Sequence, residues 1–405
     1  MGFEPHYTRI TQMEPMFPDY TKGPNLSDLV IEVIRQSSSL SAALHPITRH
    51  GVVELVRSMN SYYSNQIEGH HTHPADIEKA LAKNYSHEPA KRAMQMESAA
   101  HVEVQRLIEH RLKDEPEINI CSADFLCWIH KEFYDRLPKE FLFVDSKDGK
   151  KEIIPGELRK DEVTVGRHLA PASSCLPSFL ERFNEVYGKA RRGQIEQVVA
   201  AAASHHRLAW IHPFLDGNGR VTRLFSHAYL IKARIDGHGL WTVSRGLARN
   251  RDAYLAILAG ADEHRQGDLD GRGNLSNKGL LNFCVFFLEI ALDQIRFMSS
   301  LLELDGMKRR ISGYVERQVR LGELQEESIF LLSEVLFHGE IQRGEAPRIT
   351  GKPERTARRI LKDLLEKSLL ISDSEKGPVH LAFPAKIAAY YFPRLYPEGV
   401  EAEML

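Results

Sequence analysis

A stretch of nine residues, 212–220, constrains this chain more than any other part of its sequence. It reads His-Pro-Phe-Leu-Asp-Gly-Asn-Gly-Arg, and a second arginine follows at Arg223. A strongly helical run ends at this stretch, and the residues after it again have helix-forming composition with helical apolar spacing. Glycines let a backbone approach an anion closely. We therefore expect a tight loop between two helices, with Gly217, Asn218 and Gly219 at the N-terminus of the second helix.

The side chains of this stretch suit a nucleoside triphosphate bound together with its metal ion. Asp216 can supply an oxygen ligand to Mg²⁺, which is usually shared with phosphates. Arg220 and Arg223 are three residues apart, hence on one helix face, where both can hold a polyphosphate. His212 carries an imidazole, whose ordinary pKa suits a general base. Each residue alone is more often structural, so only the joint arrangement indicates a site.

The stretch resembles the signature of the Fic (Fic/DOC) family, HPFx[D/E]GN[G/K]RxxR, and fills every position of that pattern. The resemblance covers about residues 50–305. It implies a protein adenylyltransferase, which transfers AMP from ATP to a Ser, Thr or Tyr hydroxyl of a protein and releases pyrophosphate. The acceptor can be another protein or this chain itself.

The resemblance also implies a role for each residue of the signature. His212 takes the proton of the incoming hydroxyl, Asp216 holds Mg²⁺, and Phe214 anchors the loop. Arg220 neutralises charge on the leaving pyrophosphate, and Arg223 binds the γ-phosphate. The anion cradle for the phosphates is formed by Gly217, Asn218 and Gly219.

An upstream segment, Ser64-Asn65-Gln66-Ile67-Glu68-Gly69, fits the inhibitory motif of the same family, [S/T]xxxE[G/N]. The resemblance implies that Glu68 pairs with Arg223, so that ATP binds only in a non-productive pose. The alternative is a surface carboxylate at the end of a helix. The histidines at 70, 71 and 73 that follow are expected to be solvated loop residues, because adjacent side chains cannot both face one metal ion from regular structure.

Residues 138–174 differ from the helical segments around them. Two β-rich pieces, residues 152–159 and 162–170, follow a turn at Lys147-Asp148-Gly149 and predict a short hairpin. The second piece resembles the family's flap, to which a target protein adds a strand by main-chain pairing. The expected docking residues are Val163, Thr164, Val165 and Gly166; an ordinary surface hairpin is the alternative.

The whole pattern predicts a mainly α fold, with a Fic-type helical core, a short β-hairpin flap and a C-terminal winged helix-turn-helix domain. Helices are expected within 26–113 and over 122–137, 175–190, 194–212, 249–263 and 277–304. The predicted domains are an N-terminal helical region with the inhibitory motif (1–115), the catalytic core (116–305), a helical linker (306–325) and the winged-helix domain (326–405).

The C-terminal domain offers a different class of function. Basic residues of its expected recognition helix, Arg355, Arg358 and Arg359, could meet the phosphates of DNA. Acidic residues on the same helix dilute this charge, and winged helices also serve in dimerisation or target docking. A DNA-binding regulator is therefore one alternative function. A Fic enzyme that removes AMP with the help of Glu68, or that transfers another nucleotide moiety, is the other.

Composition is that of a globular protein: 42% of the 405 residues are hydrophobic and 27% are charged, with a net charge of −2. This charge gives no global attraction to nucleic acid or membrane. The four cysteines are scattered, without a CxxC pair, which favours free thiols in a reducing compartment. We expect a cytoplasmic protein with no membrane segment; a homodimer remains open.

Overall fold

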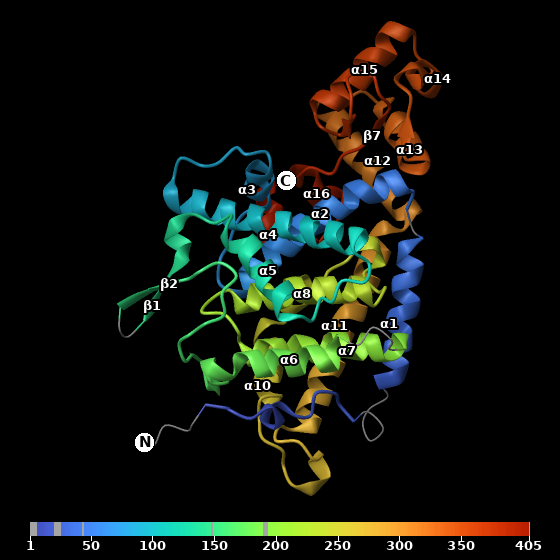
Figure 1. The fold of residues 1–405 in the computed structure, drawn as a ribbon. Helices are drawn as coiled ribbons and strands as arrows, with labels where there is room; N and C mark the ends of the chain where they lie inside the picture. Colours follow the sequence, from blue (N-terminus) through green and yellow to red (C-terminus); the bar gives the residue numbers. More distant parts are fainter. Residues whose placement is uncertain (1–5, 20–25, 43, 147–148, 189–192, 405) are drawn as a thin grey trace.

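The computed structural model of the chain describes residues 6–19, 26–42, 44–146, 149–188 and 193–404. The protein is mainly α-helical, as the sequence predicts (Figure 1). The helices of the larger, N-terminal part are α1 (Leu26–Ser41), α2 (Pro46–Ile67), α3 (Pro74–Leu81), α4 (Pro89–Asp114), α5 (Ala123–Tyr134), α6 (Leu176–Tyr187), α7 (Gln194–Ile211), α8 (Asn218–Lys232), α9 (Val243–Arg249), α10 (Arg251–Gly260) and α11 (Asn277–Leu302). The later helices are α12 (Leu304–Arg320), α13 (Ser328–His338), α14 (Ala346–Thr350), α15 (Glu354–Glu366), α16 (Ala385–Tyr391) and α17 (Glu398–Met404).

Helix α11 runs through the middle of the larger part, and α1, α7, α9 and α10 pack against it (Figure 1). Its buried side chains include Phe283, Phe287 and Ile295, which join the main hydrophobic core. Helix α8 packs against α7 on one side and against α4 and α5 on another. The loop between α7 and α8 is therefore surrounded by helices from distant parts of the chain.

Proline and glycine set several helix ends. Pro46, Pro74 and Pro89 each stand in the first turn of a helix, where the missing N–H is not needed. Helix α2 ends at Glu68, and Gly69 follows with a φ of 86°, a conformation that a side chain disfavours. The end of α2 thereby turns the chain away just after the expected inhibitory glutamate.

Residues 143–169 form two small hairpins, where the sequence predicted one. Strand β1 (Phe143–Ser146) pairs with β2 (Gly149–Glu152), and β3 (Thr164–Val165) pairs with β4 (His168–Leu169), both antiparallel. The piece 152–159 does not extend as a strand, because Pro155 and Gly156 (φ 83°) interrupt it. Gly166, with a φ of 62°, lets the second piece fold back on itself. Two residues of the expected turn, Lys147 and Asp148, lie outside the described residues.

Between α12 and α16 the chain forms three α-helices, α13, α14 and α15, and a three-stranded sheet of order β5-β7-β6. Two short apolar runs, residues 369–373 and 379–383, predict strands, and β6 (Leu370–Ile371) and β7 (Val379–Leu381) lie within them. Strand β5 (Glu340–Ile341), which pairs with β7, was not expected. Two residues carry too little periodicity to predict a strand. Helices α13, α14 and α15 pack against one another and the sheet borders them.

The residues after β7 return to the larger part of the molecule. The Tyr63 hydroxyl of α2 donates to the Leu395 carbonyl at 2.9 Å. Arg245 of α9 donates to the carbonyls of Leu395 and Arg394, and Tyr396 lies buried against the rings of Tyr62 and Tyr63. The C-terminal segment thus packs on α2 directly before Ser64. In the described part of the chain, no helix combines the length and apolar character that a bilayer crossing needs.

Candidate functional site

The tight loop between α7 and α8 holds the signature residues, as the sequence predicts. Helix α7 ends at His212, whose backbone is left-handed (φ 49°, ψ 61°), and α8 begins after Gly217 (φ 77°). A left-handed backbone costs a residue other than glycine free energy, so the surroundings must hold His212 in place. Within this segment, Pro213, Phe214 and Asn218 are buried.

Asn218 braces this loop from within. Its side-chain amide accepts a hydrogen bond from the Phe214 N–H at 2.9 Å and donates to the Phe214 carbonyl at 2.7 Å. The Phe214 ring is fully buried and stacks on His130, with 4.1 Å between centroids. The predicted anchoring of the loop by Phe214 therefore agrees with its packing. The Asn218 side chain is engaged by the loop, which leaves backbone N–H groups at the start of α8 to meet an anion.

Tyr134 of α5 supports the proposed metal ligand. Its hydroxyl donates to Asp216 Oδ2 at 2.9 Å. Burial raises the pKa of Tyr134 well above its ordinary value, and the nearby charge of Asp216 adds to this rise. A Cβ atom at Gly217 would come within 2.6 Å of the Tyr134 ring, so only glycine fits there. Tyr134 was not predicted, because nothing in the sequence links it to a residue 82 positions later.

Ser64 and Glu68 of the upstream motif both contact Arg223. The Arg223 guanidinium donates to Ser64 Oγ at 2.8 Å, to the Ser64 carbonyl at 3.0 Å and to Glu68 Oε1 at 2.6 Å. Burial raises the pKa of Glu68, but the charges of Arg223 and Arg220 outweigh it and hold the pKa below the ordinary value. Glu68 Oε1 also lies against Gly219, where a Cβ atom would overlap it. The carboxylate thus occupies the N-terminus of α8.

Arg220 has a partner that the sequence did not reveal. Its guanidinium pairs with Glu97 Oε1 of α4 at 2.6 Å, and Glu97 is completely buried. The other carboxylate oxygen lies 2.7 Å from Nδ1 of His70. This hydrogen bond to Glu97 raises the pKa of His70. His70 is therefore not the solvated loop residue that was expected, because its ring is held by a buried charge.

The environment of His212 keeps its imidazole in the neutral form. Burial lowers its pKa to about 4, with a smaller contribution from the nearby His168. The imidazole is therefore neutral at physiological pH, with a free lone pair. His168 lies on β4, and its Nε2 is 2.7 Å from the Trp210 carbonyl. This contact attaches the hairpin of the expected docking residues to the end of α7, close to the catalytic loop. In that hairpin Thr164, Val165 and Gly166 are exposed and Val163 is half-buried.

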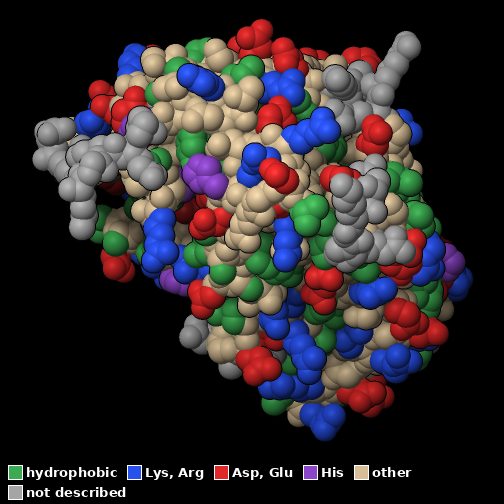
Figure 2. Space-filling model, turned by 90° about the horizontal axis from the view of Figure 1, so that it is seen from below, with side chains coloured by type: hydrophobic (Ala, Val, Ile, Leu, Met, Phe, Trp, Pro, Cys, Tyr) green, Lys and Arg blue, Asp and Glu red, His purple; other side chains and the backbone are tan. Residues whose placement is uncertain are grey.

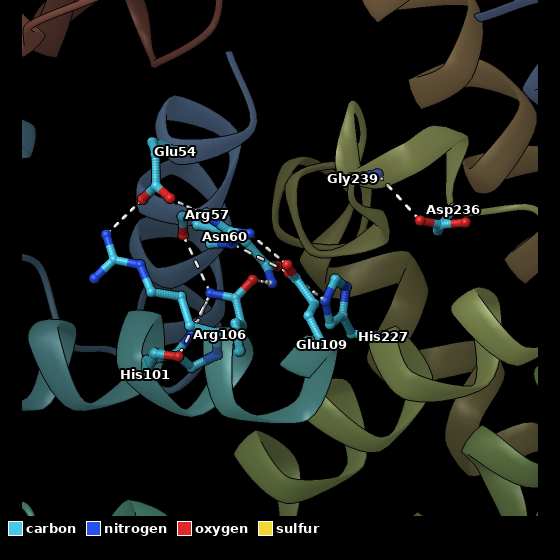
Figure 3. Close-up of polar contacts among 10 residues, drawn as sticks. Glu54, Arg57, Asn60, His101, Arg106, Glu109, His227, Asp236 and Gly239 are labelled. Carbon is cyan, nitrogen blue, oxygen red and sulfur yellow. Dashed lines mark hydrogen bonds and ion pairs between the residues drawn. The ribbon is translucent and has the colours of Figure 1, made fainter. Parts of the chain in front are cut away.

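A second polar network, away from the loop, connects α2 with α8 (Figure 3). Arg57 of α2 pairs with Glu54 and with Glu109 of α4, and Glu109 Oε1 contacts Nε2 of His227 at 3.0 Å. Burial raises the pKa of Glu109, but its bonds to His227 and Arg57 hold it at about 2. His227 follows Arg223 by one helical turn. Helix α2 is thus joined to α8 directly at Arg223 and, through Glu109 of α4, at His227.

The arginines proposed for DNA lie elsewhere. Arg355, Arg358 and Arg359 are exposed on α15, at the end of the molecule away from α8 (Figure 1). Arg358 pairs with Glu354 of the same helix at 2.5 Å. Figure 2 shows one face of the molecule, on which Lys and Arg side chains lie among Asp and Glu side chains. This mixture agrees with the small net charge.

Among the described residues, no group of three or more His, Cys, Asp or Glu side chains could hold a metal ion by itself. A single carboxylate, Asp216, fits the way in which Mg²⁺ is bound, since this ion keeps several waters and takes its other ligands from substrate phosphates. The donor set of the loop therefore suits a metal that arrives with a nucleotide.

Comparison with known proteins agrees with the sequence resemblance. Residues 120–230 match the model of the Fic/DOC family. The proteins named protein adenylyltransferase Fic from Drosophila mojavensis and Drosophila melanogaster are each 37% identical over 78 residues. The matched segment is 19% of this chain and 16% of each relative, so the chain spans only a small part of their length.

Solved structures show the same fold over most of the chain. A Fic family protein from Desulfovibrio desulfuricans superposes with a TM-score of 0.52 at 17% identity, over 90% of this chain and 98% of that one. Fic-1 from C. elegans superposes with a TM-score of 0.53 at 16% identity, over 69% and 73% of the two chains. The mainly helical fold of the Fic type, predicted from the sequence, is confirmed.

Proposed function

Because residues 120–230 match the model of the Fic/DOC family, we propose that this chain is an autoinhibited protein adenylyltransferase, which transfers AMP from ATP to a hydroxyl of a protein. The observation that carries the proposal is the contact of Glu68 with Arg223 and Gly219 at the N-terminus of α8. A site built to bind a polyphosphate is occupied there by a carboxylate of the same chain. The name of the matched Drosophila proteins supports the reaction type.

The reaction follows from the chemistry of the loop. The acceptor hydroxyl oxygen attacks the α-phosphorus of ATP, the bond from this phosphorus to the bridging oxygen of pyrophosphate breaks, and the hydroxyl proton passes to a ring nitrogen of His212. A base with a pKa of about 4 is present in its neutral form at physiological pH. Arg220 and the N–H groups of Gly217 and Gly219 stabilise the negative charge on the phosphates.

Mg²⁺ would be held by Asp216 together with the phosphates of ATP and would neutralise part of their charge. Tyr134 fixes the orientation of the Asp216 carboxylate through its hydrogen bond. The Asp216 side chain is therefore already held in one orientation, so that it can bind the metal ion without first losing rotamer freedom.

Inhibition would arise from competition for Arg223. With Glu68 paired to this arginine and lying over Gly219, the γ-phosphate lacks its cation and meets a negative charge. ATP then binds with its α-phosphorus away from His212. Release of the end of α2 would free Arg223 for the nucleotide.

The hairpin β3–β4 would dock the target. Its exposed residues Thr164 and Val165 offer main-chain N–H and C=O groups to an added strand. His168 attaches the hairpin to the end of α7. A strand on this edge would bring its hydroxyl toward His212.

The test uses ATP labelled at the α-phosphate, Mg²⁺ and the full chain, alone and with cell lysate. We compare the wild type, Glu68→Gly, and Glu68→Gly combined with His212→Ala. Protein-bound label is expected with Glu68→Gly only, since the wild type is inhibited and the double variant lacks its base. If every variant binds ATP and none labels protein, the adenylyltransferase proposal fails.

A second Fic reaction would use the same site to hydrolyse the bond between AMP and a modified protein. If Glu68 activates water to remove AMP from a modified protein, Glu68→Gly abolishes the removal and does not release a transfer activity. Incubating AMP-labelled protein with the wild type and with Glu68→Gly distinguishes removal of AMP from transfer of AMP. Loss of label with the wild type alone favours removal.

For the C-terminal region we propose a winged helix-turn-helix domain. The order α13, β5, α14, α15, β6, β7 and the sheet order β5-β7-β6 support it. The exposed basic face of α15 favours DNA as a further partner. Binding of duplex DNA that weakens with salt and with loss of Arg355, Arg358 and Arg359 tests this function; equal binding by the triple alanine variant excludes α15 as the contact.

A further inference from the structure

Arg159 is a buried arginine for which the proposed reaction has no direct use. It lies between β2 and β3, and its side chain is 0% exposed. The only carboxylate paired with it in the described chain is that of Glu162, at 3.6 Å. Burial lowers the pKa of its guanidinium. A buried guanidinium without a close counter-ion is costly unless its N–H groups find acceptors.

Its acceptors are backbone carbonyls from three places. Nε donates to the His212 carbonyl at 2.8 Å, Nη1 to the Asp161 carbonyl at 2.8 Å, and Nη2 to the Pro171 carbonyl at 2.6 Å. The backbone N–H of Arg159 also donates to the Pro213 carbonyl at 3.0 Å. Asp161 precedes β3 and Pro171 follows β4. One side chain therefore joins the catalytic loop to both ends of the hairpin.

The bond to His212 falls at a strained point of the loop. His212 has a positive φ of 49°, which turns its carbonyl out of the hydrogen-bond pattern of α7. A left-handed backbone is unfavourable for a residue other than glycine, so other contacts must stabilise it. The guanidinium supplies a donor for this carbonyl. The Arg159 guanidinium thereby stabilises the backbone conformation that sets the direction of the His212 imidazole.

We propose that Arg159 is a positioning residue, which sets His212 and the hairpin β3–β4 in register. This inference rests on the proposed function, in which the hairpin presents a hydroxyl to His212. With both held by one planar guanidinium, the base and the acceptor strand keep a fixed separation. Lysine cannot replace it, because a single ammonium does not reach three carbonyls in fixed directions.

The test uses the full chain with Glu68→Gly as the parent. Arg159→Lys is made in this parent, together with the matched control Arg245→Lys. Arg245 is also buried and donates to two backbone carbonyls, those of Arg394 and Leu395, away from His212. For each protein we measure ATP affinity, thermal midpoint, AMP released to water and AMP transferred to protein.

Arg159→Lys is expected to lower transfer to protein by about tenfold or more, since small misplacements of reacting groups have large effects on rate. Transfer to protein should fall more than release of AMP to water, because water needs no hairpin. ATP affinity should stay within about twofold of the parent, because Arg159 does not touch the residues expected to hold the phosphates. Arg245→Lys should keep the parent's ratio of transfer to release.

Four results overturn the inference. Transfer equal to that of the parent removes any positioning role. A parallel loss of ATP affinity, thermal midpoint and both activities assigns Arg159 to stability alone, as does the same change of ratio in Arg245→Lys. If the parent labels no protein at all, the proposed function fails, and this inference fails with it. Arg159→Gln provides a second variant if Arg159→Lys does not fold.

Discussion

Helices α8 and α15 each carry two arginines three residues apart, and the surroundings of the two pairs differ. On α8, Arg220 and Arg223 are 6% and 3% exposed and pair with carboxylates of α4 and α2. On α15, Arg355 and Arg358 are exposed, and Arg358 pairs with a glutamate of its own helix. The spacing is the same in both, so spacing does not separate a site from a solvated face. A site is distinguished from a solvated face by the burial of its arginines and by their pairing with carboxylates from distant helices.

Burial of the α8 pairs also supports the role proposed for them in binding a polyphosphate. Moving charges out of water costs more than a pair usually returns, so apolar residues would stabilise such positions as well or better. Two buried arginines at a helix N-terminus make sense where a polyphosphate must be held. On α15 the exposed pair is worth little to stability.

The largest effect is expected from Arg220→Met. It leaves Glu97 buried with only His70 beside it, and breaking a buried pair in this way costs about 3 kcal/mol. Transfer by the Glu68→Gly parent should fall about 100-fold or more, because charge on the leaving group loses its cation. Arg358→Met on α15 is the control, with a change within about 0.5 kcal/mol. Similar losses of unfolding free energy in both variants would remove the contrast between the helices.

The next largest effect is expected from acid, which should lower the unfolding free energy of the larger, N-terminal part of the molecule. Burial lowers the pKa of His130 to about 4, of His205 to about 3 and of His212 to about 4. In the unfolded chain these histidines have a pKa of about 6.5, whereas in the folded chain they bind protons only at the lower pH values given above. The stability that they contribute is therefore complete above about pH 6.5 and falls as the pH decreases toward 4. For each histidine, a difference of one in pKa between the folded and the unfolded chain corresponds to about 1.4 kcal/mol of unfolding free energy.

Tryptophan fluorescence during urea unfolding measures this loss, because Trp128, Trp210 and Trp241 all lie in the larger part of the molecule. A midpoint that stays constant between pH 7 and 4.5 would contradict the burial of neutral histidines. Far-UV circular dichroism follows the whole chain and serves as the comparison.

A smaller effect is expected from Ser64→Ala. The variant removes one hydrogen bond to Arg223 and keeps the pair with Glu68. A hydrogen bond from a charged donor contributes about 1.5 kcal/mol or more, so transfer should rise by about tenfold over the wild type, well below the rise with Glu68→Gly. Initial rates with labelled ATP measure both. Equal activation by the two variants would mean that Ser64, rather than the carboxylate charge, holds Arg223.

The smallest effect is expected from Arg355→Ala combined with Arg359→Ala. Transfer and thermal midpoint should remain those of the parent, since both side chains are exposed on α15. If α15 binds DNA, the slope of affinity against salt should fall by about one for each lost phosphate contact. A change in transfer rate without DNA would instead connect α15 with the site.

The sequence determined the elements and the chemistry of this protein through local signals. Helical periodicity, prolines in first turns and glycines at stops predict most helices, and the stretch 212–223 predicts the loop between α7 and α8. Short elements were missed, such as α9 and β5, because a few residues carry no clear period. A strand was expected across Pro155 and Gly156, but these two residues interrupt the extended backbone and no strand forms there.

Only the tertiary structure decided which side chains meet. Glu97 and Tyr134 lie on α4 and α5, and no spacing in the sequence connects them to Arg220 and Asp216. Arg159 reaches His212 from 53 residues away. Local propensity depends on neighbours along the chain, whereas these contacts depend on how helices pack, and packing is set by the whole core at once. The sequence therefore supplies the reactive groups, and the fold supplies the residues that hold them in position.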